Sequence, residues 1–503
     1  MTESIADHFT RQAQSRPESP ALIWSGSVID YGTLEEMRGR AAAGLADLAI
    51  APDIPVGLLG KKAPEMIALV LACLAERRPF LLPSVELSPD TLAALFAQAG
   101  CSHVLSAAAG GGGAVEARAV ERDEGSPGLP PSAEGPEGVG FMLTTSGSTG
   151  LPKIVPLSPG GVDRFTEWAS EQFGIGPGTT VLNYAPLNFD LCLLDIWTTL
   201  KYGGCVAMVD QDRGTNGAYL VDLIAGHGVN VIQAVPMLYR LLIDETRENG
   251  RQFPDAVHLI TTGDKIPATS VEAVPGLFPN ARMFNIYGCT ETNDSLIYEF
   301  DLAGPAPANV PVGHPLPGVL AMMVSPEGEF VEGTGTGELV VWTPFQTAGY
   351  LTAALNDGKF AGYPDPGGDG SRIYFRTGDI VRRHEDGTLT LEGRSDFYVK
   401  VRGVRVSTQV VEQAISEHPE VVEVAVVAVP DEMAGHRLHA LVRREEGSKL
   451  NSLKLRQHCA GKLARTEMPS SIEVVTEPLP KTPTGKIDRK RCGPRQERTT
   501  ANG

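Results

Sequence analysis

The run TTSGSTGLPK at residues 144–153 constrains the chain more than any other segment. Its glycines, Gly147 and Gly150, let the backbone adopt positive φ angles and approach a ligand without a Cβ in the way. Lys153 adds a positive charge, and hydroxyl and backbone N–H groups add hydrogen-bond donors. The hydroxyl groups belong to Thr145, Ser146, Ser148 and Thr149. The run therefore predicts a loop that wraps around the phosphates of ATP.

Two other interpretations of this run have to be weighed. A Walker A loop, GxxxxGK[ST], needs its lysine directly after the second glycine, whereas Leu151 and Pro152 intervene here. A short run of glycine and serine is also typical of a flexible linker. The motifs further along the chain decide between a linker and an ATP site.

Length and composition exclude several classes of protein. With 503 residues the chain exceeds what one hydrophobic core supports, so we expect more than one domain. No apolar run approaches the roughly 20 residues that span a bilayer, and residues 1–12 lack the apolar stretch of a signal peptide. Seven scattered cysteines without a CxxC pair favour reduced thiols over disulfides or zinc. The net charge of −18 disfavours nucleic-acid binding. Together these features predict a cytoplasmic protein without membrane or nucleic-acid partners.

The first part of the chain has the texture of an α/β protein. Residues 1–105 alternate helical periodicity, as at 64–77, with short apolar runs at 56–59 and 80–82. This alternation is typical of βαβ units on a parallel sheet. The same texture resumes at residue 139, with strands expected at 140–144, 180–184, 229–234 and 258–262 and a helix at 162–173.

Changes in residue pattern at three places set the expected domain boundaries. Residues 107–138 have almost no large apolar side chains, which predicts a surface excursion. Past residue 312, short strands punctuated by glycines predict a small β-barrel-like subdomain. After Arg394, strands and helices predict a compact α+β domain of about 100 residues. We therefore expect an N-terminal core of stacked α/β sheets at 1–395 and a mobile C-terminal lid at 396–503.

Four further segments follow the first in a fixed order. They read NIYGCTET (285–292), YFRTGD (374–379), GRSDFYVKVRG (393–403) and PKTPTGKIDR (480–489). With residues 144–153 they resemble the core motifs of the adenylate-forming superfamily, which includes acyl-CoA synthetases, luciferases and the adenylation domains of nonribosomal peptide synthetases. The resemblance covers essentially the whole chain and implies ATP and Mg²⁺ as cofactors.

The resemblance assigns roles at the nucleotide. Glu291 would hold Mg²⁺ between the phosphates, which suits an ion that prefers hard oxygen ligands. Tyr287 would stack on adenine, and Asn285 would present its amide to the base edge. Asp379 would accept the ribose hydroxyls with its paired lone pairs, and Arg394 would assist at the ribose or phosphate. The implied ATP-binding set also includes Gly288, Thr290 and residues 145–150 with Lys153.

Each of these residues also has a structural interpretation. Glu291 could cap a helix, Tyr287 could be an ordinary core residue, and Asp379 and Arg394 could be surface charges.

The C-terminal motifs imply catalysis and movement. Lys486 would reach the α-phosphate and the substrate carboxylate, where its charge stabilises the negative charge that accumulates during attack. Asp396 would be the hinge about which the small domain rotates between an adenylating and a thioester-forming pose. The implied catalytic set is Lys486, Glu291 and Thr145.

The segment at 183–197 bears on the substrate. It resembles the amino-acid-activating branch, including D-alanine carrier-protein ligases, in which an aspartate after phenylalanine binds the substrate ammonium; here that residue is Asp190. Asp190 could instead cap a helix starting near Leu191, because aspartate is a favoured N-cap. The remaining pocket would be lined by Leu191, Leu194, Gln233, Ile260, Thr262, Gly263, Ile286, Asp294 and Ser295.

Departures from the family pattern are few. Cys289 replaces the usual proline of YGPTE, and Arg77, Arg78 and Pro79 stand where a glycine-rich turn is common. Asp294 adds a second carboxylate to the pocket, which suggests a second polar or cationic group on the substrate, or an amino group at the β position.

The chain carries neither a carrier-module GGxS serine nor a condensation HHxxxDG motif. We therefore expect a free-standing ligase of natural-product biosynthesis. It would adenylate an α- or β-amino acid and transfer it to the phosphopantetheine thiol of a separate carrier protein. The alternatives are a CoA ligase, a ligase that transfers the acyl group to an amine on a carrier-bound acceptor, and an ATP-binding scaffold without catalysis.

Overall fold

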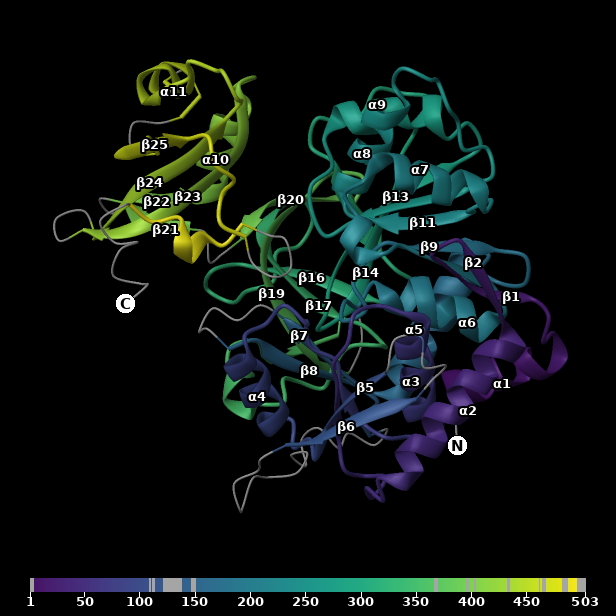
Figure 1. Cartoon of the computed structure of the whole chain (residues 1–503). Coiled ribbons are helices and arrows are strands. Elements are labelled where there is room, and N and C mark those ends of the chain that lie inside the picture. Colours follow the sequence, from purple (N-terminus) through teal and green to yellow (C-terminus); the bar gives the residue numbers. More distant parts are fainter. Residues whose placement is uncertain are drawn as a thin grey trace.

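Strands of three sheets organise the computed structural model (Figure 1). The structure describes residues 4–107, 110, 114–120, 138–145, 151–365, 370–394, 398–401, 404–431, 435–460, 462–463, 467–481 and 487–494.

The first sheet has six strands in the order β6-β5-β3-β4-β7-β8. Its inner strands run parallel, and the edge strands β6 and β8 pair antiparallel with β5 and β7. The strands are β3 (Val56–Leu58), β4 (Phe80–Leu81), β5 (His103–Ala107), β6 (Val115–Ala119), β7 (Phe141–Thr145) and β8 (Lys153–Leu157). The helices of this part are α1 (Ile5–Ser15), α2 (Tyr31–Asp47), α3 (Pro64–Ala75) and α4 (Pro89–Gln98).

Helix α3 shows how the sequence determines this layer. Pro64 occupies its first turn, where a missing N–H costs nothing, as the sequence predicts. Its side chains from Met66 to Cys73 are all buried, which is the pattern of a helix covered on every side. The turn after it contains Arg77 at φ 54°, a left-handed conformation that favours glycine. Arg78 anchors this turn by donating to the carbonyls of Ala51 and Ile50 (2.8 and 3.0 Å).

The largest sheet runs in the order β16-β17-β19-β20-β15-β14-β13-β12-β11-β9-β10-β1-β2, and β18 pairs with β19. Along this order, the neighbouring strands from β13 to β1 pair in parallel, whereas β2 pairs antiparallel with β1. These strands are β1 (Pro20–Trp24), β2 (Ser27–Asp30), β9 (Thr180–Asn183), β10 (Cys205–Met208), β11 (Val231–Ala234), β12 (His258–Thr262) and β13 (Arg282–Cys289). The antiparallel strands are β14 (Asn293–Glu299), β15 (Pro311–Pro315), β16 (Leu320–Val324), β17 (Gly335–Trp342), β18 (Phe360–Pro364), β19 (Ser371–Arg383) and β20 (Leu389–Arg394).

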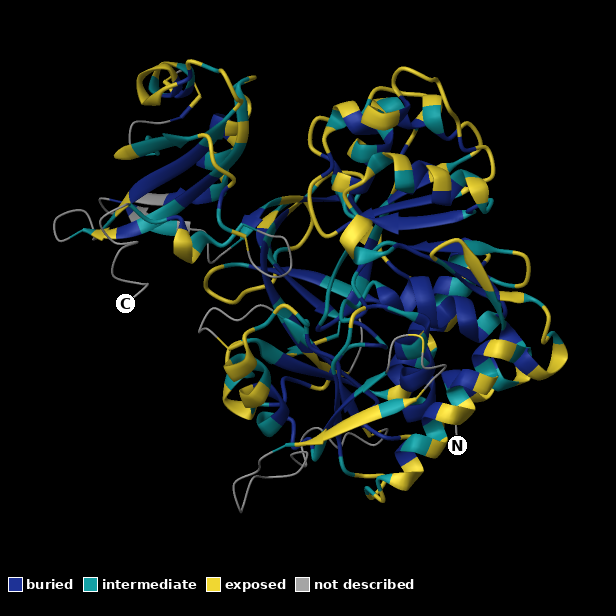
Figure 2. Ribbon diagram, viewed as in Figure 1, coloured by how far each residue is buried: buried dark blue, intermediate teal, exposed yellow. Residues whose placement is uncertain are grey.

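Alternate residues of the parallel strands point to two different cores. Val181, Val231 and Ile260 join the core that includes α5 and η1, whereas Leu182 and Ile232 join the core under the helices of the opposite face. Strands buried on both faces are typical of parallel sheets, and Figure 2 shows them as buried ribbons between partly exposed helices. The helices are α5 (Pro159–Phe173), the π-helical turn η1 (Leu193–Thr198) and α6 (Thr199–Tyr202) on one side, and α7 (Gly217–Gly226), α8 (Pro236–Thr246) and α9 (Ala268–Leu277) on the other.

The C-terminal residues form a separate small sheet in the order β22-β21-β24-β23, with β25 pairing with β24. Figure 1 shows this unit beside β20. It has its own apolar core, which includes Val411 of α10 and Leu455 of α11. Its elements are β21 (Tyr398–Val401), β22 (Val404–Ser407), α10 (Thr408–Ser416), β23 (Val421–Asp431), β24 (Gly435–Arg444), α11 (Ser452–Cys459) and β25 (Ser471–Val475). The short helical turns of the chain are η2 (Gln211–Arg213), η3 (Ala353–Leu355) and η5 (Arg489–Arg491).

The predicted α/β fold with a smaller C-terminal domain is confirmed, and two findings refine it. Residues 115–119 lie in the predicted surface excursion but form the edge strand β6, whose mostly exposed side chains explain why the sequence gives no strand signal. The glycine-punctuated strands after residue 312 join the main sheet through β15.

The structure also bears on thiols and membranes. All seven cysteines are free thiols. Within the described ranges, no helix combines the length and apolarity needed to cross a bilayer.

Candidate active site

The hairpin β7–β8 places the two flanks of the glycine-rich run side by side. Thr145 is the register partner of Lys153. The Thr145 hydroxyl is buried and has no hydrogen-bond partner among the described residues. An unpaired buried hydroxyl is costly, so this atom is available for a ligand. The other residues predicted to bind ATP in this run lie outside the described residues: Ser146, Gly147, Ser148, Thr149 and Gly150.

Tyr350 connects Lys153 to the predicted metal ligand. Its hydroxyl donates to Oε1 of buried Glu291 at 2.6 Å. The Lys153 ammonium lies 3.4 Å from the same hydroxyl and 4.5 Å from the ring centre. Burial, with the negative charge of Glu291, raises the pKa of Tyr350, so the phenol stays protonated and keeps donating. Thr145, Lys153, Tyr350 and Glu291 thus form one polar end of the site.

The residues present fit a Mg²⁺ ion bound with a nucleotide. Mg²⁺ is usually held by one or two carboxylates together with phosphate oxygens and water. Glu291 supplies one carboxylate, whose Oε2 accepts no hydrogen bond from the described residues. Within the described residues, no group of three or more His, Cys, Asp or Glu side chains is placed to hold a metal ion.

A second polar cluster forms where β19 and β20 pair. Asp379 and Arg394 are register partners, and Arg394 Nη1 lies 2.9 Å from Asp379 Oδ1. The Tyr287 hydroxyl donates to Asp379 Oδ2. A carboxylate carries two lone pairs on each oxygen, which is the acceptor pattern that binding a diol requires. Burial and the charge of Asp379 raise the pKa of Tyr287.

The hairpin β13–β14 carries the motif NIYGCTET. A Cβ on Gly288 would lie 2.3 Å from the carbonyl oxygen of Asn293, so no other residue fits there. Asn293 itself adopts φ 53° at the turn. Asn285 donates one amide N–H to the carbonyl of Pro311 at 2.7 Å, which leaves its other N–H and its oxygen for a ligand. The thiol of Cys289 lies 3.2 Å from the Thr292 hydroxyl.

Asp190 lies in the turn between β9 and η1, beside the nucleotide motif. Thr290 hydrogen-bonds its carboxylate, and the charge of Glu291 acts on it. Burial is the main reason why the pKa of Asp190 is raised. The residue that caps η1 is Cys192, so Asp190 does not hold the N-cap position of that helix, although its carboxylate also accepts from the Leu191 backbone.

Asp294 follows the turn of the β13–β14 hairpin and is partly buried. Burial, with the nearby charge of Asp190, raises the pKa of Asp294 to about 8. No hydrogen bond from a described residue reaches its carboxylate, including from neighbouring backbone. The charge of Asp190 therefore acts on Asp294, whose carboxylate accepts no hydrogen bond from the described residues.

The other predicted pocket residues differ in how accessible they are. Gln233, Ile260 and Ile286 are buried in the sheet, with exposed fractions of 2, 0 and 2 %. The Ser295 hydroxyl is already bonded to the Asn293 carbonyl and lies 3.0 Å from the Thr292 hydroxyl. Leu194 and Thr262 are buried, Leu191 is partly buried, and Gly263 turns the chain after β12 at φ 81°.

Comparison with known proteins decides the family. The profile of the AMP-binding enzyme family matches residues 9–351, and that of the AMP-binding enzyme C-terminal domain matches residues 410–486. The chain belongs to the AMP-binding enzyme family. It is thus an adenylate-forming ligase, and enzymes of this family use ATP.

Individual relatives agree with this assignment. An L-proline--[L-prolyl-carrier protein] ligase of Pseudomonas fluorescens is 30 % identical over 93 % of this chain and 87 % of its own. A D-alanine--D-alanyl carrier protein ligase of Bacillus licheniformis is 27 % identical over 97 % of this chain and 98 % of its own. The solved structure of o-succinylbenzoate CoA synthetase from Bacillus subtilis with ATP and magnesium has a TM-score of 0.79 at 21 % identity, covering 96 and 98 % of the two chains.

Tyr350, which contacts Glu291 and Lys153 of this AMP-binding enzyme, escaped the sequence analysis, as did two buried polar residues beside β9, Asp195 and Lys62. Asp195 on η1 is fully buried and accepts from Asn183 Nδ2 at 3.1 Å. Buried Lys62 donates to the carbonyls of Asn183 and Ala185, both at 3.0 Å. A lone acid inside the apolar run LLDIW is the one signal that could have found Asp195.

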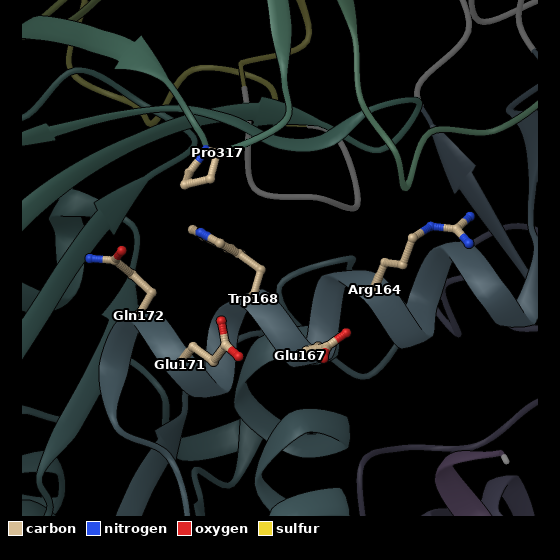
Figure 3. A pocket seen from close by; sticks show the side chains of 6 residues that line it. All are labelled: Arg164, Glu167, Trp168, Glu171, Gln172 and Pro317. Atoms are coloured by element: carbon tan, nitrogen blue, oxygen red, sulfur yellow. The ribbon is translucent and has the colours of Figure 1, made fainter. Parts of the chain in front are cut away.

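A hollow of about 360 Å³ between α5 and Pro317 is lined by none of these residues (Figure 3). It is lined by Arg164, Glu167, Trp168, Glu171, Gln172 and Pro317. None of them is a predicted site residue. The predicted lysine Lys486 and hinge Asp396 lie outside the described residues.

Proposed function

We propose that this ligase activates an amino acid as aminoacyl-AMP and transfers it to the phosphopantetheine thiol of a separate carrier protein. The observation that carries the proposal is the position of Asp190. Its carboxylate lies beside Glu291 and Thr290 of the nucleotide motif, and its pKa is raised because it is buried.

A carboxylate in such a place favours a cationic substrate. Burying it as an anion is costly unless a cation pairs with it. The ammonium of an amino acid supplies that cation, whereas a fatty or aromatic acid does not. Asp190 would thus select amino acids over plain carboxylic acids.

The relatives support both the amino acid and the carrier. The proline and D-alanine ligases named above act, by their names, on carrier proteins, and each aligns with nearly all of this chain.

The first step would be attack of the substrate carboxylate on the α-phosphorus of ATP. A C(=O)O–P bond forms, the bond from the α-phosphorus to the bridging oxygen breaks, and pyrophosphate leaves. Thr145 and Lys153 would bind phosphate, Lys486 would stabilise the charge at the α-phosphate, and Asp379 would hold the ribose. Mg²⁺ held at Glu291 would neutralise charge on the phosphates.

The second step would be attack of the carrier thiol on the acyl carbon. A thioester forms, AMP leaves, and the thiol proton goes to solvent. Rotation of a lid at 396–503 about Asp396, relative to a core at 1–395, would let one site serve both steps.

Exchange of labelled pyrophosphate into ATP tests the first step, with pairs that differ only by the amino group: alanine and propionate, proline and cyclopentanecarboxylate, β-alanine and propionate. Exchange with an amino acid and none with its deaminated partner supports the proposal. Acceptor use is then measured with CoA and with a phosphopantetheinylated carrier protein. Faster turnover with CoA would favour a CoA ligase instead.

A further inference from the structure

The loop between β9 and η1, which carries Asp190, is closed at its base by hydrogen bonds. Asn183 ends β9, and its Nδ2 donates to Asp195 Oδ2 of η1 at 3.1 Å and to Cys192 Sγ at 3.5 Å. The Cys192 thiol donates in turn to the carbonyl oxygen of Pro186 at 3.2 Å. These bonds join the end of the strand to the start of the helical turn.

A side chain from the six-stranded sheet holds the same base. Buried Lys62 follows β3, and its ammonium donates to the carbonyls of Asn183 and Ala185, both at 3.0 Å. Strand β9 pairs with its neighbours as far as Asn183, so Ala185 lies beyond the sheet. Lys62 therefore fixes the two carbonyls from which the Asp190 loop departs.

Stability alone does not account for this lysine. Both acceptors of its ammonium are neutral carbonyls, so neither is an anion that offsets the cost of burying the charge. Burial lowers the pKa of Lys62 to about 8, because the charged form is disfavoured in the folded protein. Methionine would fill a similar space without that cost. What the ammonium adds is the pair of hydrogen bonds to the base of the loop.

The preceding residue offers an internal comparison. Lys61 forms an ion pair with Asp212 of η2 at 2.8 Å, and the two side chains are 66 and 69 % exposed. This pair also joins the segment after β3 to the largest sheet, but an exposed ion pair contributes little to stability. The backbone N–H of Lys62 donates to Gln211 Oε1 at 3.3 Å, so exchanging the Lys62 side chain leaves that contact in place.

We propose that Lys62 is a positioning residue for substrate recognition, because its ammonium fixes the base of the loop that carries Asp190. This inference deepens the proposed function and rests on Asp190 as the residue that binds the substrate ammonium. A recognition group has to be held within about 0.5 Å of its productive position. A loop supplies such precision when other residues brace it, and here Lys62 and Cys192 do so.

Ligand affinity tests the proposal without requiring turnover. An aminoacyl sulfamoyl adenosine, which is a stable analogue of aminoacyl-AMP, is compared with its deaminated analogue by calorimetry. Lys62→Met should reduce the preference for the amino compound by about 10- to 100-fold, the size of a hydrogen bond to a charged group. The affinity for the deaminated compound should change by less than about threefold. Lys61→Met, the matched control, should change neither affinity.

A double-mutant cycle shows whether Lys62 acts through Asp190. Asp190→Ala should remove the preference for the amino compound, and adding Lys62→Met to that variant should then change the preference by less than about twofold. A loss of folded protein, by contrast, would lower the number of binding sites for both compounds and leave their affinities unchanged. Lys62→Gln keeps N–H donors on a side chain one atom shorter, so its preference should lie between those of the wild type and Lys62→Met.

The outcomes separate this inference from the proposed function. If Asp190→Ala removes the preference and Lys62→Met leaves it unchanged, the positioning role is wrong and the proposed function stands. An equal effect of Lys62→Met with Asp190 present or absent also overturns the positioning role. If Lys62→Met does not fold, Lys62→Gln carries the same comparison, and failure of both variants to fold would show that Lys62 serves the fold instead. If Asp190→Ala leaves the preference unchanged, Asp190 does not recognise the ammonium and both proposals fail.

Discussion

The carboxylates at the nucleotide end and at the amino-acid end of the site receive different numbers of hydrogen bonds from the protein. At the nucleotide end, Glu291 accepts from Tyr350, and Asp379 is paired with Tyr287 and Arg394. At the amino-acid end, Asp294 has no hydrogen bond from a described residue, and buried oxygens of Asp195 and Gln233 are unpartnered. Both carboxylates of the first end are held by protein groups, although the Thr145 hydroxyl there also lacks a partner among the described residues, whereas Asp294 at the second end is held by none of them.

This difference follows from what each end has to recognise. ATP is the same ligand in every adenylate-forming enzyme, so its contacts can be preorganised by internal partners. The acyl substrate differs between enzymes, and a buried acceptor without a partner rejects any substrate that lacks the matching donor. Variants at the nucleotide end should therefore lower kcat/KM for ATP, whereas variants at the amino-acid end should lower kcat/KM for the amino acid.

Asp190→Ala should give the largest effect. Removing one partner of a buried charge pair costs about 3–5 kcal/mol, so kcat/KM for the amino acid should fall by roughly 150- to 5000-fold, with KM for ATP little changed. Steady-state pyrophosphate exchange measures both. Equal losses in kcat/KM for ATP and for the amino acid would mean that Asp190 supports the fold and does not recognise the substrate.

Lys486→Ala should lower the rate of adenylate formation by a factor on the order of 10² or more. This is the scale of the effect of removing one charged group that stabilises a transition state. Transfer from supplied aminoacyl-AMP to a thiol should be largely spared, because the proposed role belongs to the first pose. Undiminished pyrophosphate exchange in this variant would show that Lys486 does not stabilise the adenylation transition state.

Lys62→Met should change how stability depends on pH. Burial lowers the pKa of Lys62 to about 8 from 10.5, so between these values the unfolded chain binds a proton that the folded chain does not. Stability from this group therefore rises with pH across that window, by about 3 kcal/mol in total. Urea unfolding of wild type and variant should be measured at pH 7.5, 9 and 10.5. The free energy of unfolding of the wild type should rise relative to that of the variant as the pH increases. A constant difference would mean that Lys62 titrates normally.

Tyr350→Phe should give the smallest loss and confine it to the nucleotide end. Loss of a hydrogen bond to the Glu291 carboxylate costs about 1.5–3 kcal/mol, which predicts a roughly 10- to 100-fold fall in kcat/KM for ATP. The ratio of kcat/KM between matched amino acids should not change. A changed ratio would show that the two ends are coupled.

The sequence predicts the fold well because its signals are local. Pro64 starts α3, and alternating apolar runs give the parallel strands. The motif residues Tyr287, Asp379 and Arg394 do meet in space, but the register that joins the last two comes from strand pairing that the sequence does not show.

The residues that escaped prediction act over long sequence separations. Tyr350 meets Lys153 across 197 positions, and Lys62 meets Asn183 across 121. Such contacts depend on how the sheets pack, and no local pattern encodes them. Asp195 was hidden for a different reason, because its apolar neighbours make η1 look like ordinary core helix.

Proton release on binding tests the central claim most directly. Calorimetry at pH 7, in buffers of different ionisation enthalpy, would compare an aminoacyl sulfamoyl adenosine with its deaminated analogue. The pKa of Asp294 is raised to about 8, and burial also raises the pKa of Asp190, so an ammonium that pairs with these carboxylates favours their ionised forms and displaces protons from whatever fraction is protonated at pH 7. The account predicts proton release with the amino compound and none with the deaminated one. Equal proton release, or none from either compound, would contradict it.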